Sequence, residues 1–196
     1  MMKFKIVEYG CLNELQKNQA VELFIEGFGH FMTFSKDEDL KRKLFFEMFH
    51  PALFLCYVED EKVLGLMGIA TNKIRPLNFA YDLCIKYFGK IKGAILSKQM
   101  NAIFQTPVVK TKSELYIDIL VTGSEARRKG VGTALLEHAF EMEGYTVWSV
   151  EAFSNNQAAI SLYEKNGFRI EQRKKRSLMR FLGAGYPIRL RKSDIK

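Results

Sequence analysis

The stretch Arg127-Arg128-Lys129-Gly130-Val131-Gly132-Thr133 organises this chain. A largely apolar run over residues 115–122 precedes it and has the composition of a buried strand. Apolar residues at helical spacing follow it over residues 131–143. Glycine lacks a Cβ, so the backbone can approach a ligand closely here, and a helix N-terminus offers unpaired N–H groups with a partial positive charge. With three cations before Gly130, these features predict a site for a phosphate or pyrophosphate.

The composition is that of a folded protein with a sizeable core. The chain has 196 residues, of which 47% are hydrophobic and 27% charged, so we expect a single domain over residues 1–196. We see no apolar run of membrane-spanning length and no signal-peptide pattern, and we therefore expect a cytoplasmic protein with no membrane partner. The three cysteines and three histidines lack the spacing of metal ligands, and we expect no metal.

The chain is basic, with 30 Lys and Arg against 22 Asp and Glu. A net charge of +8 fits a nucleic acid, an anionic surface or an anionic cofactor as partner. Six of the cations cluster near the C-terminus: Arg169, Arg173, Lys174, Lys175, Arg176 and Arg180. We favour a solvated hairpin for this cluster over a dedicated anion or nucleic-acid patch. Few aromatic residues accompany the cluster, so stacking on bases is poorly supported.

The remaining elements follow from periodicity and capping signals. Capping boxes at Asn13 and at Ser35 begin two helices, and a third helix begins at Ser154. Two strands over 53–58 and 63–71 form a hairpin, and strands over 3–9, 146–152, 168–175 and 186–191 complete the sheet. This order predicts an α/β fold with mixed strand pairing.

Two further features bear on a substrate site. Residues 75–110 contain two helices divided by Gly89, and this insertion is either a wall over a substrate or ordinary packing. The apolar loop 29–34 is either a core plug or a second wall. Within the strand 115–122, alternation places Asp118 on one face with Tyr116, Leu120 and Thr122. A carboxylate in a buried strand is costly unless it is bonded or lies at a wet site.

The glycine loop lacks both the G-x-G-x-x-G of a dinucleotide fold and the P-loop pattern. Its R-x-x-G-x-G, Arg127 to Gly132, resembles the [RQ]-x-x-G-x-[GA] signature of the GCN5-related N-acetyltransferases. A second motif, Asn156-x-x-Ala159-x-x-x-Tyr163-x-x-x-Gly167-Phe168, resembles a later helix of the same family. The resemblance is strong from Leu115 to Phe168, and the insertion has no family counterpart that we can align.

The resemblance implies a fold and a co-substrate. The fold is α/β, with a mixed, mostly antiparallel six- to seven-stranded sheet flanked by helices and a helical insertion at about 76–104. The co-substrate is acetyl-CoA. The backbone of Leu120, Val121 and Thr122 would splay from its neighbour and bind the pantetheine arm. Asn156 would bond to the same arm. The pyrophosphate would bind the loop residues Arg127, Arg128, Lys129, Gly130, Val131, Gly132 and Thr133.

The resemblance also implies catalytic roles. Tyr163 would lie near the thioester and protonate the departing thiolate as a general acid. A phenol has a pKa near ~10 and is protonated at neutral pH, so the chemistry agrees. The alternative is a core tyrosine whose hydroxyl bonds to backbone. Some members carry a basic glutamate on the central strand, at or near Tyr116 here. Asp118 is the best substitute as base, Glu151 is second, and water-relayed deprotonation is third.

These inferences predict an acetyl-CoA-dependent N-acetyltransferase. The acceptor would be a primary amine of a small molecule or peptide that attacks the thioester directly, and the enzyme would be a monomer or homodimer. Two alternatives remain: a CoA-binding module without catalysis, and a nucleic-acid-binding protein that uses the basic C-terminal hairpin. An intact Tyr163 disfavours the first alternative.

Overall fold

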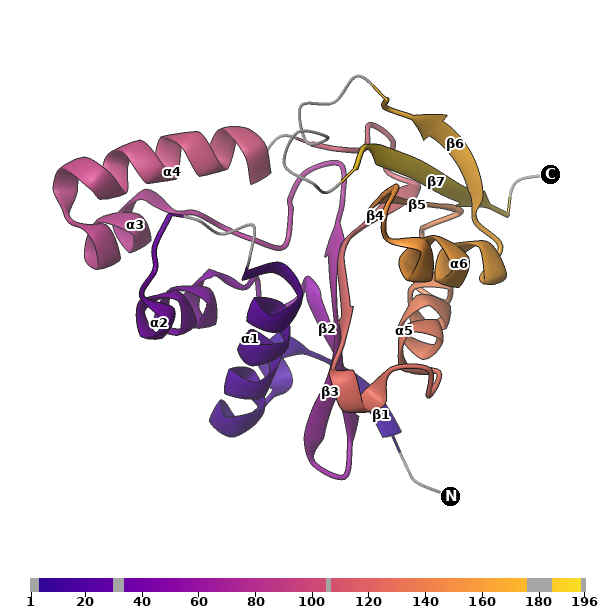
Figure 1. Ribbon diagram of the computed structural model, residues 1–196, viewed down its shortest axis with the longest axis horizontal. Helices are drawn as coiled ribbons and strands as arrows, with labels where there is room; N and C mark the ends of the chain where they lie inside the picture. The colour runs from indigo at the N-terminus through magenta and orange to yellow at the C-terminus, as the bar shows by residue number, and fades with distance from the viewer. Residues whose placement is uncertain (1–3, 30–33, 105–106, 176–184, 195–196) are drawn as a thin grey trace.

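A computed structural model describes residues 4–29, 34–104, 107–175 and 185–194. Residues 30–33 of the predicted loop 29–34, and the cations Arg176 and Arg180, lie outside this part of the chain. In the described part, the strands form one seven-stranded sheet in the order β1-β2-β3-β4-β5-β7-β6 (Figure 1). The strands are β1 (Phe4–Glu8), β2 (Phe54–Glu59), β3 (Lys62–Ala70), β4 (Glu114–Thr122), β5 (Val147–Phe153), β6 (Arg169–Arg173) and β7 (Pro187–Ser193).

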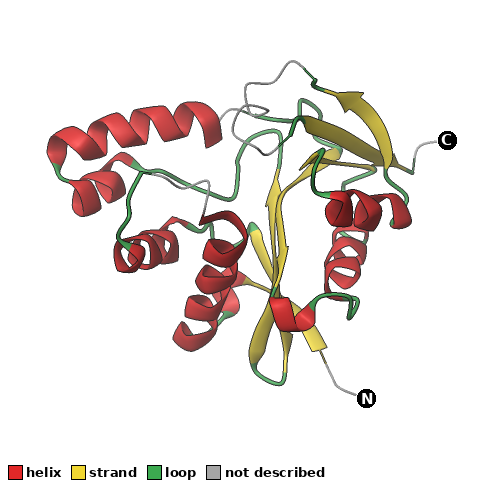
Figure 2. Cartoon of the chain, viewed as in Figure 1, coloured by secondary structure: helices red, strands yellow, loops and turns green. Residues whose placement is uncertain are grey.

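Helices cover both faces of the sheet, as the cartoon in Figure 2 shows. One face packs against α1 (Glu14–Phe28) and α2 (Glu38–Met48) through an aromatic core that includes Phe24, Phe45 and Phe54. The other face packs against α5 (Val131–Phe140) and α6 (Gln157–Lys165) through Leu135, Trp148 and Ile160, among others. The sheet therefore separates two hydrophobic cores, which confirms the predicted fold class.

Strands β4 and β5 form the one parallel pair among the described strands, and all other neighbours are antiparallel. Parallel neighbours need a crossover connection, and α5 supplies it between these two strands. The N-terminus of α5 is consequently held at the end of β4, in the middle of the sheet (Figure 1). No helix in the described part of the chain is long and apolar enough to cross a membrane.

Two of the predicted helix starts were wrong by two residues. The capping box of Asn13 and Gln16 is present as predicted. The next helix, however, is capped by Asp37, whose side chain accepts a hydrogen bond from Leu40 N at 3.0 Å, whereas Ser35 forms a turn before it. Helix α6 is capped by Asn156 rather than by Ser154. In both cases a carboxylate or amide oxygen caps the helix in place of the serine hydroxyl. Asp, Asn and Ser are about equally preferred as N-caps, so residue type alone does not decide between them.

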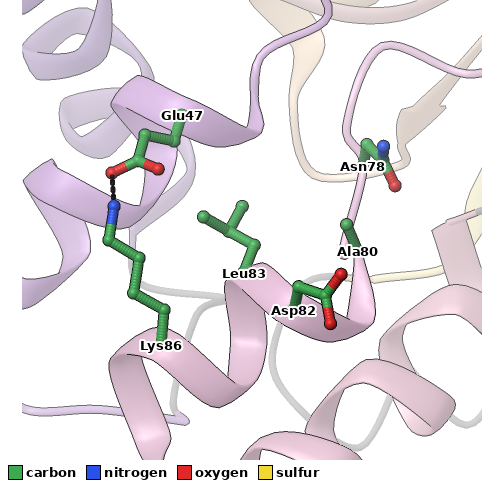
Figure 3. A pocket seen from close by; sticks show the side chains of 6 residues that line it. All are labelled: Glu47, Asn78, Ala80, Asp82, Leu83 and Lys86. Carbon is green, nitrogen blue, oxygen red and sulfur yellow. Dashed lines mark hydrogen bonds and ion pairs between the residues drawn. The ribbon is translucent and has the colours of Figure 1, made fainter.

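The insertion forms α3 (Tyr81–Phe88) and α4 (Lys90–Phe104), and Gly89 between them has a φ of 75°. Helix α3 packs against α2, where Lys86 Nζ lies 2.6 Å from Glu47 Oε1. Helix α3 is not buried all round, because its first residue, Tyr81, is 56% exposed. A shallow pocket opens between α2 and α3 (Figure 3), lined by Glu47, Asn78, Ala80, Asp82, Leu83 and Lys86.

Candidate active site

Strands β4 and β5 separate at the centre of the sheet. Their pairing runs from Glu114↔Val147 to Ile117↔Val150 and ends there. Beyond this point β5 continues along β7, while β4 continues along β3 up to Thr122. The backbone of Leu120, Val121 and Thr122 therefore has a strand partner on the β3 side and no described strand on the β5 side. This is the splay that the family resemblance implied.

A β-bulge at Asp118 accompanies the splay. Gly68 pairs with Ile119 and Ile69 pairs with Ile117, so Asp118 is the extra residue of β4. The predicted alternation was therefore wrong: Tyr116 packs against Ala70 and Val109, whereas Leu120 packs on the α5/α6 side. A bulge adds one residue and turns the following side chains to the opposite face.

The glycine loop adopts left-handed backbone at two positions. Gly130 caps α5 with a φ of 86°, a conformation that glycine adopts without penalty. Arg128 has a φ of 62°, which is uncommon for a residue with a side chain. Such positive φ values in a turn bring successive N–H groups toward one concave surface, which is the geometry of an anion site. The side chains of Arg127, Arg128 and Lys129 are all exposed beside this turn.

The first turn of α5 keeps its N–H donors available. The first backbone bond into the helix runs from Ala134 N to Gly130 O at 2.9 Å, and we find no acceptor in the described residues for Val131, Gly132 or Thr133 N–H. Lys129 N differs, because it bonds to Ala126 O at 3.3 Å. The predicted set of backbone donors therefore comes together, with Lys129 N already engaged.

Close packing fixes the position of α5. A Cβ on Gly65 would lie 2.5 Å from Val131 Cγ1, so β3 touches α5 at a residue without a side chain. A Cβ on Gly132 would lie 3.1 Å from Leu162 Cδ2, so the second glycine of the motif lets α6 pack against α5. Gly130 thus serves the turn, whereas Gly132 serves the contact between the two helices.

Helix α6 carries the second motif. The Asn156 side chain accepts a hydrogen bond from Ala159 N at 3.1 Å, and the residue is exposed. Tyr163 is buried, and its ring lies 5.6 Å from that of Phe168. Burial raises the pKa of Tyr163 well above its ordinary value, so the hydroxyl is protonated at neutral pH. We find no hydrogen bond of this hydroxyl to any described residue, backbone included.

Arg75, which the sequence analysis did not single out, holds Asp118. Arg75 Nε donates to Asp118 Oδ2 at 2.8 Å, and Nη2 donates to Oδ1 at 2.6 Å. The two side chains are only 9% and 11% exposed. This two-pronged pair satisfies both carboxylate oxygens and ties the loop after β3 to the bulge. No local pattern marks it, because 43 residues separate the partners.

A second polar network was also missed. Glu114 and Ser149 are buried on the sheet face opposite α5 and α6, and Ser149 Oγ donates to Glu114 Oε1 at 2.7 Å. Arg189 of β7 joins them, with Nη2 3.0 Å from Glu114 Oε1. Its guanidinium also lies 5.9 Å from the centre of the Tyr116 ring. Three strands therefore supply this polar network, which lies on the Tyr116 face near the point where β4 and β5 separate.

The site thus has two sides. Tyr163 and Leu120 belong to the apolar cluster on the α5/α6 face. Tyr116 faces the opposite side, with the carboxylates of Asp118 and Glu151 close enough to act on the pKa of its hydroxyl. Tyr163 and the two carboxylates therefore lie on opposite faces of the sheet.

Comparisons with known proteins agree with this geometry. A model of the acetyltransferase (GNAT) family matches residues 18–168. An N-acetyltransferase from Staphylococcus aureus Mu50 is 19% identical with a TM-score of 0.62, over 95% of this chain and 99% of that one. A GCN5-related N-acetyltransferase from Kribbella flavida is 14% identical with a TM-score of 0.62, over 97% of each chain. A chain of the NatC complex bound to Gag peptide and CoA is 17% identical with a TM-score of 0.59, over 98% of this chain and 99% of that one.

The structural likenesses show the fold, and a search of curated proteins found no match. The family match extends from α1 through the end of the second motif, and it includes the splay, the glycine loop and α6. Membership of this family supports acetyl-CoA-dependent acetyltransfer in general terms. On the residues matched, the chain belongs to the acetyltransferase (GNAT) family.

Proposed function

We propose that the protein transfers the acetyl group of acetyl-CoA to a primary amine by direct attack of the amine on the thioester. The observation that carries this proposal is the continuity between the splay and the glycine loop. The unpaired edge of β4 ends at Thr122, and the anion-binding turn begins within a few residues of it. An extended chain with a pyrophosphate at one end fits this arrangement.

The cofactor would bind in two parts. Backbone groups of Leu120, Val121 and Thr122 would pair with the amides of pantetheine as an added strand would. The N–H groups of residues 130–133, with the charges of residues 127–129, would hold the pyrophosphate. Asn156 contributes its amide near the start of α6, where its oxygen already caps the helix.

Tyr163 would complete the chemistry as the general acid. Its hydroxyl is protonated because burial raises its pKa, and we find no bond to a described residue that would occupy its proton. When the C–S bond breaks, this proton would neutralise the thiolate. Asp118 lies at the bulge of β4. Its bonds to Arg75 would fix the backbone there, next to the position of the thioester.

Cofactor binding is tested by thermal denaturation with and without acetyl-CoA. A ligand that binds only the native state at 100 times its Kd stabilises it by about 2.7 kcal/mol. For a chain of this size that raises Tm by roughly 2–4 °C per kcal/mol. An unchanged Tm at millimolar acetyl-CoA would contradict the proposal.

Transfer is tested with a panel of primary amines that includes amino acids, polyamines and peptides with free N-termini or lysines. Release of the CoA thiol and a mass gain of one acetyl group identify an acceptor. A protein that binds acetyl-CoA but acetylates none of these amines would favour the non-catalytic CoA-binding alternative.

The role of Tyr163 is tested with Tyr163→Phe. We expect unchanged acetyl-CoA affinity and a kcat lower by about 10²–10⁴-fold, since that is the usual contribution of a positioned acid. Tyr9→Phe is the matched control, because Tyr9 is also buried with a raised pKa but bonds to Phe46 O, in the other core. Equal kcat values for the two variants would remove Tyr163 from the chemistry.

A further inference from the structure

Three carboxylates lie on the sheet face of Tyr116, opposite α5 and α6. Glu114 is buried and bonded to Ser149 and Arg189, and the other two are Asp118 and Glu151. Burial is the main cause that raises the pKa of Tyr116, and the negative charges of Glu151 and Asp118 raise it further. Arg75 and Arg189 act in the opposite direction. Asp118 and Glu151 are therefore the two candidate bases to compare by their contacts.

Asp118 is poorly placed to accept a proton from a substrate. Both its oxygens already accept hydrogen bonds from the Arg75 guanidinium, at 2.8 and 2.6 Å. Its side chain is only 11% exposed, and that of Arg75 is 9% exposed. An incoming ammonium would have to break a buried two-pronged ion pair, and the separated charges would then lie unpaired in a poorly hydrated environment.

Glu151 differs in each of these respects. It follows Val150, the last residue of β5 that pairs with β4, so it lies at the mouth of the splay. Its side chain is 25% exposed. Among the described residues, the ammonium of Lys174 donates a hydrogen bond to Glu151 Oε1. Because this single ion pair is partly exposed to solvent, another cation can replace Lys174 at little cost in free energy.

The partner of Glu151 is itself a primary alkylammonium. Lys174 lies at the end of β6, its backbone N–H is held by Pro187 O at 2.9 Å, and its side chain is 42% exposed. The lysine stem is flexible, and its ammonium is chemically equivalent to the amine that the reaction consumes. The protein therefore shows, with its own side chain, what Glu151 can bind.

We propose that Glu151 is the general base of the transfer, and that Lys174 occupies the place of the acceptor ammonium until an acceptor displaces it. This inference rests on the proposed function and assigns its acceptor subsite. It implies that the acceptor is a primary alkylammonium that binds beside Tyr116. Asp118 is then a positioning residue that acts through the bulge.

The proton balance is as follows. Glu151 takes one proton from the ammonium and releases it to solvent, which leaves a neutral amine. The nitrogen lone pair forms a bond to the thioester carbonyl carbon, and the C–S bond breaks with its electron pair on sulfur. Tyr163 protonates the thiolate and is reprotonated by the second proton that the nitrogen loses. The products are an acetamide, the CoA thiol and one proton.

The test uses the best acceptor from the amine panel and three single variants of the full chain. Glu151→Gln should lower kcat by about 10²–10⁴-fold while acetyl-CoA still raises Tm as in the wild type. Lys174→Met keeps the apolar stem and removes the competing charge. It should lower the KM for the acceptor by up to about fivefold, the equivalent of the roughly 1 kcal/mol that a part-exposed ion pair contributes. Its kcat should not fall.

Glu171→Gln is the matched control, since Glu171 is a carboxylate on β6, two strands from Glu151, and its ion-pair partners are Arg189 and Arg191. It should leave kcat and KM unchanged. A kcat for Glu151→Gln within a few-fold of the wild type would overturn the assignment of the base. A raised KM in Lys174→Met would contradict the proposal that Lys174 competes with the acceptor for Glu151. This variant tests that proposal even where Glu151→Gln does not fold. Wild-type inactivity toward every amine would instead contradict the proposed function.

Discussion

The two halves of β4 have different surroundings. Residues 114–117 pair with β5, and the side chains of Glu114 and Tyr116 lie among charged groups from β5 and β7. Residues 119–122 pair with β3 only, and the strand leads directly into the glycine loop. The extra residue at Asp118 divides the strand and turns the side chains after it to the opposite face.

The difference lies in how charge is compensated. At the first half, each charged group has an internal partner: Arg75 with Asp118, Arg189 with Glu114, and Lys174 with Glu151. At the second half, the loop presents exposed cations, and the pair between Arg127 and Glu26 is long, at 3.4 Å. At the proposed acceptor end, an incoming charged group would exchange with charges that are already paired. At the proposed cofactor end, the excess positive charge favours an anion such as the pyrophosphate of acetyl-CoA.

The largest expected effect on stability comes from breaking the ion pair between Arg75 and Asp118, at the point where β4 divides. Arg75→Ala leaves the Asp118 carboxylate buried without its guanidinium, and removal of one partner of a buried ion pair costs about 3–5 kcal/mol of unfolding free energy. Urea denaturation measures this loss. Adding Asp118→Asn to Arg75→Ala removes the stranded charge, so the double variant should recover part of the stability. A double variant less stable than Arg75→Ala would mean that Asp118 is held by other contacts.

The second prediction alters the contact that positions the glycine loop. In Gly65→Ala the new Cβ would lie 2.5 Å from Val131 Cγ1 and 3.1 Å from Leu135 Cδ1, so α5 must shift. Overpacking of this kind costs about 1–3 kcal/mol. Because the shift moves the N-terminus of α5, acetyl-CoA affinity measured by calorimetry should also fall.

Gly144→Ala is the control for that experiment. Gly144 follows α5 with a φ of 87° and has nothing within 4 Å of an added Cβ. Its variant should lose about 1–2 kcal/mol through backbone strain alone and keep its acetyl-CoA affinity. Equal losses of affinity in the two variants would show that general destabilisation, and not the position of α5, controls cofactor binding.

The backbone of the glycine loop, at the proposed cofactor end of β4, followed from the sequence for a physical reason. The end of the strand, the glycine turn and the first turn of α5 follow one another along the chain, so local conformational rules describe them. The splayed edge was implied by the family resemblance. The left-handed φ values at Gly89, Gly130 and Gly167 lie where glycine marked an element boundary. Helix starts were less certain, because Ser35 and Asp37 both have side chains that can cap a helix.

The acceptor end was predicted only in part, because distant residues assemble it. Asp118 and Glu151 were recognised as carboxylates on strands, but their partners Arg75 and Lys174 lie 43 and 23 residues away. Glu114, Ser149 and Arg189 come from three strands and share no local pattern. Gly68, opposite the bulge, was the available signal. Nothing in β4 alone, however, shows that Asp118 is the extra residue.

The smallest effect on stability, and the sharpest test of the charge comparison, comes from Arg127→Ala. Arg127 and Glu26 are 60% and 44% exposed, so the loss of their ion pair should cost less than about 1 kcal/mol of stability. If Arg127 serves the cofactor, acetyl-CoA affinity should fall by roughly fivefold at low salt, and its dependence on salt should weaken. Glu26→Gln distinguishes the two roles. It breaks the same ion pair but leaves the cation available, so acetyl-CoA affinity should hold or rise. A parallel loss of affinity in both variants would mean that Arg127 acts only by pairing with Glu26, and the excess charge of the loop would then not be what binds the anion.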